Sequence, residues 1–249
     1  MERLSAGRVP IVWRTATVRG IVDETTHART LLLDAPGWPG HVAGQHVDVR
    51  LTADDGYQAE RSYSIASAPE SDMLALTVER IDDGEVSPYL AGDLLVGDPL
   101  ELRGPIGRPF TWRVTDGGPL LLVAGGSGLV PLMAMLRHRA AQASHVEAHL
   151  LVSSRGWDDV LYRDELAQLA SSPGLDITYT LTRQRPEGWT GFARRVDSEM
   201  LVAVAPPVAA APRIFVCGPT PFVEHVADAL VALTYPPQTI HAERFGPTG

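Results

Sequence analysis

The sequence predicts a two-domain protein in which an antiparallel β-barrel is followed by an α/β domain with a parallel sheet. Two observations support this fold class. From residue 12 to about residue 104, short β-rich runs alternate with turn residues at even spacing. After residue 116, continuous apolar runs alternate with helical segments. The 249 residues suffice for two ordinary domains, which we expect at 1–114 and 115–249, with the boundary within 113–119.

The first half contains short runs rich in β-branched and aliphatic residues. We expect strands over 14–18, 30–33, 46–51, 57–60 and 74–78. Turn residues separate them at 36–40, 54–56 and 82–84, where glycine tolerates a positive φ and aspartate bonds to nearby backbone groups. Even spacing of this kind is typical of an antiparallel barrel.

The second half begins with the apolar run 120–124, which leads into Gly125-Gly126-Ser127-Gly128 and then into a helical stretch over 131–142. Three more apolar runs follow, at 149–152, 177–181 and 214–216, each with a helical or mixed segment after it. Strands that are apolar throughout are buried on both faces, so these runs predict a parallel sheet with helices on both sides.

The glycine turn between strand and helix has the chemistry of an anion site. Backbone amides and the positive end of the helix meet there, which suits a pyrophosphate. The G-x-G-x-x-G fingerprint is incomplete, because Pro131 stands where the third glycine would be. Taken alone, the turn is equally typical of a tight strand-to-helix connection.

A second motif, Arg61-Ser62-Tyr63-Ser64, follows the expected strand 57–60 in the barrel half. Arginine can hold a diphosphate through two hydrogen bonds, and an aromatic residue two places on points the same way and can lie against a flat ring. The adjacent hydroxyl can meet a ring nitrogen. Taken alone, the motif also fits an exposed arginine and an ordinary strand tyrosine.

Composition excludes several classes of function. The formal net charge of -9 argues against a nucleic-acid partner. Cys217 is the single cysteine, so the sequence cannot form a disulfide framework, a structural zinc site or a cysteine-ligated cluster, and we expect no metal site. No apolar run approaches the roughly 20 residues of a membrane span, and residues 1–5 lack the features of a signal peptide. We therefore expect a cytoplasmic protein.

Four motifs occur in one order with two-domain spacing: Arg61-x-Tyr63-Ser64, the glycine turn, Cys217-Gly218-Pro219-Thr220 and Glu243-Arg244-Phe245. Together they resemble the ferredoxin-NADP reductase family, which includes the reductase components of bacterial oxygenases, over roughly residues 15–245. The resemblance implies a flavin-binding barrel and a nucleotide-binding α/β domain. It also implies FAD as cofactor, with FMN left open, and NADPH or NADH as substrate.

The resemblance assigns the FAD contacts to the barrel. Arg61 would bind the FAD pyrophosphate, Tyr63 would pack on the isoalloxazine or its ribityl chain, and Ser64 would hydrogen-bond flavin N5. The segment Val78-Glu79-Arg80 would lie near the adenosine end, and a short helix beginning at 84–87 would face the phosphates. In the last segment the implied contacts are Gly84, Val86 and Ser87, although the segment also fits a hairpin followed by a helix-capping serine.

The same resemblance assigns the nicotinamide contacts to the second domain. The glycine turn, residues Gly125, Gly126, Ser127 and Gly128, would cradle the pyrophosphate of the nicotinamide dinucleotide, and Gly218, Pro219 and Thr220 would assist. Cys217 would flank the nicotinamide, Glu243 would lie at the flavin, and Phe245 would cover the flavin and have to yield. Ser64, Cys217, Glu243 and Phe245 are thus the implied catalytic residues. A lone buried cysteine and a terminal aromatic residue are also typical of core packing.

The choice between NADPH and NADH depends on the ends of the second and third parallel strands. These ends read Ser153-Ser154-Arg155 and Thr182-Arg183-Gln184-Arg185, with no acidic residue before Asp158. A 2′-phosphate calls for arginine and hydroxyl donors, whereas NAD sites usually offer a carboxylate. The Thr182-Arg183 pair resembles the Ser-Arg pair of NADP-dependent relatives, so we expect Ser154, Arg155, Thr182 and Arg183 to favour NADPH over NADH.

The resemblance as a whole implies an FAD-dependent NAD(P)H oxidoreductase. It would transfer hydride from NADPH to FAD and then pass electrons to a separate acceptor protein, such as a ferredoxin or an oxygenase component. The protein would hold nicotinamide C4 within about 3 to 3.5 Å of flavin N5. Two alternatives stay open: a stand-alone reductase of free flavin or small molecules, and a non-catalytic flavin-binding electron-transfer subunit.

Overall fold

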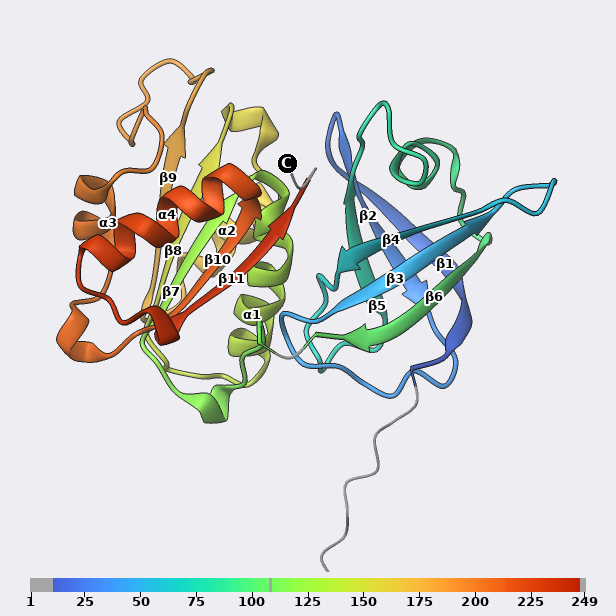
Figure 1. Ribbon diagram of the computed structural model, residues 1–249, viewed down its shortest axis with the longest axis horizontal. Coiled ribbons are helices and arrows are strands. Elements are labelled where there is room, and N and C mark those ends of the chain that lie inside the picture. The colour runs from blue at the N-terminus through green and yellow to red at the C-terminus, as the bar shows by residue number, and fades with distance from the viewer. Residues whose placement is uncertain (1–10, 108, 247–249) are drawn as a thin grey trace, which may run out of the picture.

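The computed structural model describes residues 11–107 and 109–246, which form two domains lying side by side (Figure 1). The first is an antiparallel sheet and the second a parallel sheet covered by helices, so the predicted fold class is confirmed. The expectation that rested on residues 1–5 falls on a segment outside the described residues.

The first domain is a six-stranded barrel with strand order β4-β3-β6-β1-β2-β5. Its strands are β1 (Trp13–Thr25), β2 (Ala28–Asp34), β3 (His46–Thr52), β4 (Gln58–Ser64), β5 (Leu74–Glu79) and β6 (Pro99–Ile106). The two edge strands meet just beyond β4, at a bridge between Ile65 and Leu76 and a 2.8 Å hydrogen bond from Ala66 N to Ala75 O. Alternate residues such as Leu31 and Leu33 are buried in the barrel core, because successive side chains of a strand point to opposite faces.

The second domain has a five-stranded parallel sheet with order β11-β10-β7-β8-β9. Its strands are β7 (Leu120–Gly125), β8 (Ala148–Ser154), β9 (Leu175–Leu181), β10 (Arg213–Pro219) and β11 (Ile240–Phe245), and its helices are α1 (Leu129–Ala141), α2 (Arg163–Leu169), α3 (Ser198–Val204) and α4 (Thr220–Ala232). Every residue of the central strand β7 is buried. Leu120 and Leu122 pack with α1 and α2, while Leu121 and Val123 pack with α3 and α4.

Short helical segments connect the main elements. They are a π-helical turn at Tyr89–Asp93 and 3₁₀ turns at Val114–Asp116, Gly126–Gly128, Trp157–Asp159, Val208–Ala210 and Pro237–Thr239.

Three local details differ from the sequence expectations. The Arg61 motif does not follow a strand but forms the second half of β4. Helix α1 begins at Leu129, two residues earlier than expected, because the 3₁₀ turn at Gly126–Gly128 leads directly into it. Strand β11 was not expected, since half of its residues are polar, yet an edge strand needs fewer apolar residues than a central one.

The two domains share a buried contact along α1. Arg137 donates to the carbonyl of Ala66 in the barrel over 2.8 Å, and His138 Nδ1 lies 2.7 Å from the carboxylate of Glu70. Barrel residues including Ala66 and Ala75 belong to the same apolar cluster as the buried face of α1. The junction is therefore a packed interface of apolar, hydrogen-bonded and charged groups.

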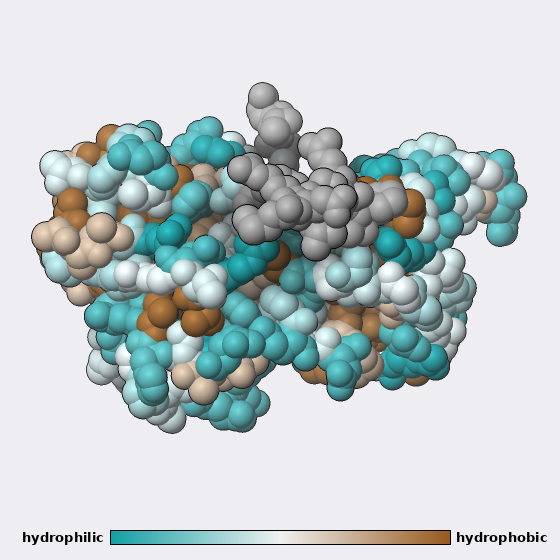
Figure 2. All heavy atoms as spheres, turned by 90° about the horizontal axis from the view of Figure 1, so that it is seen from below, coloured by the Kyte–Doolittle hydropathy of each residue, from teal (hydrophilic) through white to brown (hydrophobic). Residues whose placement is uncertain are grey.

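Hydrophilic residues cover most of the face seen in Figure 2, and hydrophobic residues form small separate groups on it. None of the helices within 11–107 and 109–246 combines the length and the hydropathy that a membrane span requires.

Candidate active site

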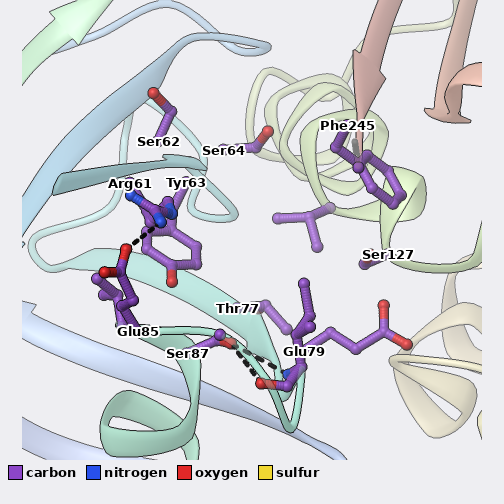
Figure 3. Close-up of a pocket in the computed structure, with 15 residues that line it drawn as sticks. Arg61, Ser62, Tyr63, Ser64, Thr77, Glu79, Glu85, Ser87, Ser127 and Phe245 are labelled. Carbon is purple, nitrogen blue, oxygen red and sulfur yellow. Dashed lines mark hydrogen bonds and ion pairs between the residues drawn. The ribbon is translucent and has the colours of Figure 1, made fainter. Parts of the chain in front are cut away.

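A cavity of about 280 Å³ opens between the two domains, and both contribute to its walls (Figure 3). From the barrel, it is lined by 61–64 on β4 and by 84–87 after β5. From the second domain, Ser127 of the glycine turn, Val130 of α1 and Phe245 of β11 line it. Residues that the sequence analysis singled out in separate halves of the chain thus share one cavity.

At one end of the cavity, Arg61 is ion-paired with Glu85. Its other terminal nitrogen donates to the carbonyl of Glu60 over 2.7 Å, and Tyr57 donates to the Glu85 carboxylate over 2.6 Å. The hydrogen bond from Tyr57, followed in size by the one from Arg61, holds the pKa of Glu85 below its ordinary value. The guanidinium is therefore already oriented on an anionic group, as binding of a phosphate would require.

Arg61 and Tyr63 point to the same side of β4, as alternate strand residues do (Figure 3). Burial raises the pKa of Tyr63 to about 12, so its hydroxyl stays protonated at physiological pH. Ser64 lines the cavity at the end of the strand. Its neighbour Ser62 donates to Asp48 over 2.7 Å.

Of the segment Val78-Glu79-Arg80, Glu79 lines the cavity. Val78 is fully buried in the barrel core and is not among the residues that line the cavity. Thr77, Glu79 and Ile81 do line it. Successive strand residues alternate between faces, which separates Val78 from both of its neighbours.

The segment after β5 is a tight turn whose shape depends on Gly84 and Ser87. A Cβ at Gly84 would approach the carbonyl of Ile81 and the Ser87 hydroxyl to 3.0 Å each. Ser87 does not cap the following helical turn; its Oγ accepts from the backbone N–H of Ile81 over 3.1 Å. Val86 is buried in the barrel core and also contributes to the cavity wall.

The glycine turn divides into packing positions and one open position. A Cβ at Gly128 would collide with the carbonyl of Cys217, and one at Gly125 or Gly218 would come within 2.7 Å of the Phe222 ring. These glycines permit close approach of β7 and β10. Gly126 has a φ of +55°, and a Cβ added there would have no other atom within 4 Å. Its backbone therefore faces open space just before α1, as a phosphate cradle requires.

Cys217 and Glu243 are register partners on β10 and β11, so the topology brings two implied catalytic residues together. Burial, and then the nearby Glu243, raise the pKa of Cys217 well above its ordinary value, which keeps it a thiol. Burial raises the pKa of Glu243 to about 7. Phe245 lines the cavity from the end of β11, where it is paired in register with Pro219, whereas Cys217 is buried and does not line the cavity.

Two buried side-chain oxygens have no hydrogen-bond partner within the described residues, and both belong to the predicted site. They are Thr220 Oγ1, in the first turn of α4, and Glu243 Oε2. Buried polar atoms almost always have partners, so orphaned ones indicate a place for a polar ligand or water. With the Arg61 anion site and the bare backbone at Gly126, they make this junction fit a flavin diphosphate and a nicotinamide nucleotide.

The four residues expected to choose between NADPH and NADH lie together at the carboxyl edge of the sheet. Thr182 donates to the carbonyl of Ser154 through its N–H (2.9 Å) and its hydroxyl (3.1 Å), and Arg183 N donates to the carbonyl of Arg155 over 2.8 Å. Arg155 and Arg183 are exposed, and neither has an ion pair within the described residues. Their charges are available to a bound phosphate.

The sequence reasoning missed several residues of the site. Glu85 was quoted only as part of its segment, and its pairing with Arg61 carried no sequence signal because the two lie 24 positions apart. Thr77 could have been found by applying the two-residue period of a strand to the expected run 74–78. His46, 3.6 Å from Glu243, carried no signal either, since its place depends on the packing of the two domains.

Comparison with known proteins agrees with this geometry. Residues 23–111 match the oxidoreductase FAD-binding domain family, and residues 122–228 match the oxidoreductase NAD-binding domain family. The chain is 30% identical to the glycine betaine monooxygenase reductase subunit of Pseudomonas aeruginosa, over 92% of this chain and 63% of that protein. It is also 30% identical to the ferredoxin reductase component of 3-ketosteroid-9-alpha-monooxygenase of Mycobacterium tuberculosis, over 90% of this chain and 63% of that protein.

Among solved structures, the FAD/NAD-binding domain of nitric oxide dioxygenase from Vibrio cholerae superposes with a TM-score of 0.83 at 25% identity. That likeness covers 94% of this chain and 99% of the other. The chain spans a little under two thirds of the length of the two monooxygenase reductase relatives.

Proposed function

The chain belongs to the ferredoxin-NADP reductase family, and on this premise we propose that it is an FAD-dependent NAD(P)H reductase that supplies electrons to a separate protein. The observation that carries the proposal is the cavity between the domains, which joins the Arg61 motif to Ser127 and Phe245. Its electron acceptor is a ferredoxin or an oxygenase component, in keeping with the names of the monooxygenase relatives.

Bound FAD and nicotinamide nucleotide supply the hydride chemistry, so the residues of the chain bind and orient. Arg61 binds the FAD diphosphate in exchange for Glu85. Tyr63 packs against the flavin, and Ser64 donates to the flavin nitrogen N5. Phe245 covers the opposite side of the cavity and moves aside for the nicotinamide.

The second domain binds the nucleotide. The backbone at Gly126 and Ser127 and the positive end of α1 receive its pyrophosphate, and the Thr220 hydroxyl donates a hydrogen bond there. Arg155 and Arg183 receive a 2′-phosphate, so the preferred substrate is NADPH. The Glu243 carboxyl, whose pKa is raised to about 7, lies beside Cys217 and can be neutral or ionised near neutral pH.

The proposal is tested by mixing the purified yellow protein with NADPH or NADH in the absence of oxygen. Rapid loss of the visible flavin absorbance, faster with NADPH, is expected because the nucleotide reduces the flavin directly. A flavin that stays oxidised with both nucleotides would overturn the reductase assignment. Electron delivery is then measured by reduction of a bacterial ferredoxin.

Ser64→Ala tests the assignment at the reacting atom. We expect flavin reduction to slow by on the order of 10-fold while FAD affinity is unchanged, because a hydrogen bond to the developing charge is lost. Ser62→Ala is the matched control, since Ser62 is the next serine on β4 and bonds to Asp48. Equal rates in wild type and Ser64→Ala would remove Ser64 from the mechanism.

A further inference from the structure

A closed ring of hydrogen bonds joins the two domains beside the cavity. Tyr162, between β8 and α2, donates its hydroxyl to Thr77 Oγ1 on β5. Thr77 and its cross-strand partner Thr30 are in contact through their hydroxyls at 2.7 Å, and Thr30 donates to Glu24 over 2.6 Å. The other Glu24 oxygen accepts from the backbone N–H of Tyr162 at 3.3 Å, which closes the ring.

The direction of every bond in the ring is fixed by proton count. Each hydroxyl has one proton to donate, and Thr30 gives its own to Glu24. Thr77 must therefore donate to Thr30, and its acceptor position is taken by Tyr162. Burial raises the pKa of Tyr162, so it remains a donor at physiological pH. The ring has one consistent arrangement.

Local irregularities on both sides of the junction aim these groups at each other. On the barrel side, the pairing of β1 with β2 shifts register between Asp23 and Thr25, so Glu24 lies in a bulge, a feature that redirects a side chain. On the other side, Tyr162 has a left-handed backbone with φ of +55°, which is strained for an aromatic residue. Backbone strain of this kind persists only where the surroundings enforce it.

Charged groups hold the Tyr162 ring in place. The Arg137 guanidinium lies 4.8 Å from the centre of the ring, and it also forms a two-point ion pair with Glu165 and donates to the carbonyl of Ala66. Tyr162 itself is buried in the apolar cluster that spans the junction.

The ring of hydrogen bonds connects the proposed flavin cavity with the proposed nucleotide-binding loop. Thr77 lines the flavin cavity. Tyr162 ends the loop that begins after Ser154, the same loop that carries Arg155. A shift of Tyr162 would therefore move the nucleotide-binding loop relative to the flavin cavity.

We propose that Tyr162 is a positioning residue that fixes the nucleotide-binding domain against the barrel at the separation that hydride transfer requires. This inference rests on the proposed reductase function. Tyr162 does not line the cavity; it acts through Thr77 and the loop 155–162. Its removal affects the rate of flavin reduction and leaves the binding of both cofactors intact.

The test is Tyr162→Phe in the FAD-loaded protein, studied by anaerobic stopped flow with NADPH and NADH. We expect the reduction rate at saturating nucleotide to fall by on the order of 10-fold, because small misplacements of reacting atoms slow reactions steeply. The dissociation constants of FAD and nucleotide are expected to stay within about twofold of wild type. Tyr235→Phe is the matched control, since this buried tyrosine loses a hydroxyl bond to Pro206 O inside the second domain.

A second variant and a second measurement separate positioning from a general loss of structure. Thr30→Val opens the ring from the barrel side without altering a cavity residue. The double variant with Tyr162→Phe is expected to be no slower than Tyr162→Phe alone, since both changes break one ring. Hydrogen exchange of FAD-loaded protein without nucleotide is expected to rise in β5 and in 160–166 for Tyr162→Phe, and not for Tyr235→Phe.

The inference is overturned if Tyr162→Phe is reduced as fast as wild type, if Tyr235→Phe slows equally, or if only nucleotide affinity changes. Failure of the proposed function has a different signature, because the flavin of the wild type would then stay oxidised with both nucleotides.

Discussion

Replacing Glu243 by glutamine is expected to stabilise the cofactor-free protein at neutral and alkaline pH. The Glu243 carboxyl has one oxygen buried without a partner, and burial raises its pKa to about 7. Its other oxygen lies 3.6 Å from Nδ1 of His46, but burial lowers the pKa of His46, so the imidazole is mostly neutral at pH 7. The ionised carboxylate therefore lacks an effective counter-charge.

The sign and magnitude follow from proton linkage. The carboxyl has a pKa of 4.5 in the unfolded chain and about 7 in the folded one, so the folded state holds the proton more tightly. The unfolding free energy therefore falls as pH rises from about 4.5 through about 7, by about 3 kcal/mol in total. Glutamine imitates the protonated carboxyl and does not undergo this loss. The variant should match wild type near pH 4.5 and exceed it by up to about 3 kcal/mol near pH 8.

The assay is urea unfolding of both proteins, freed of flavin, at several pH values between about 5 and 8. The difference between the two curves cancels the contributions of all other titrating groups. Glu187→Gln is a control at an exposed carboxylate and should show no divergence with pH. A Glu243→Gln difference that is constant with pH, or a variant less stable than wild type at pH 8, would show that the buried Glu243 carboxylate does not destabilise the folded protein.

Three further predictions concern binding and folding. Arg61→Ala should weaken FAD binding by roughly 10- to 100-fold, and Glu85→Gln should tighten it because a competing anion is removed. Flavin fluorescence titration measures both affinities, and weaker FAD binding by Glu85→Gln would contradict the replacement of Glu85 by the diphosphate on Arg61. Arg183→Ala should raise KM for NADPH by roughly 10-fold or more and leave KM for NADH within about twofold, whereas equal steady-state effects would argue against a 2′-phosphate site. Gly128→Ala should lower the unfolding free energy by about 1 to 3 kcal/mol, since its Cβ meets the Cys217 carbonyl, and an unchanged melting temperature would disprove that contact.

Much of the fold could be predicted from periodicity. Runs apolar throughout, such as 120–124, gave the parallel sheet, because only strands covered on both faces have that composition. Strand β11 escaped prediction because an edge strand needs no continuous apolar run. Within the segment Val78-Glu79-Arg80, alternation alone puts Glu79, and with it Thr77, on the face opposite Val78.

The site was predicted where motifs are local and missed where partners come together from distant parts of the chain. The residues of Arg61-x-Tyr63-Ser64 are adjacent in sequence and appear in the cavity together. The Glu24 to Tyr162 contact joins residues 138 positions apart across a domain junction, and no sequence pattern encodes it. Such contacts depend on how the two sheets pack against each other, which propensity and motif spacing do not describe.

The most direct test of the central claim is a crystal structure of the protein with FAD bound. We expect the FAD diphosphate on Arg61 in place of Glu85, and the flavin ring between Tyr63 and Phe245 in the cavity shared by the two domains. An intact Arg61–Glu85 pair with FAD bound elsewhere on the molecule would contradict it.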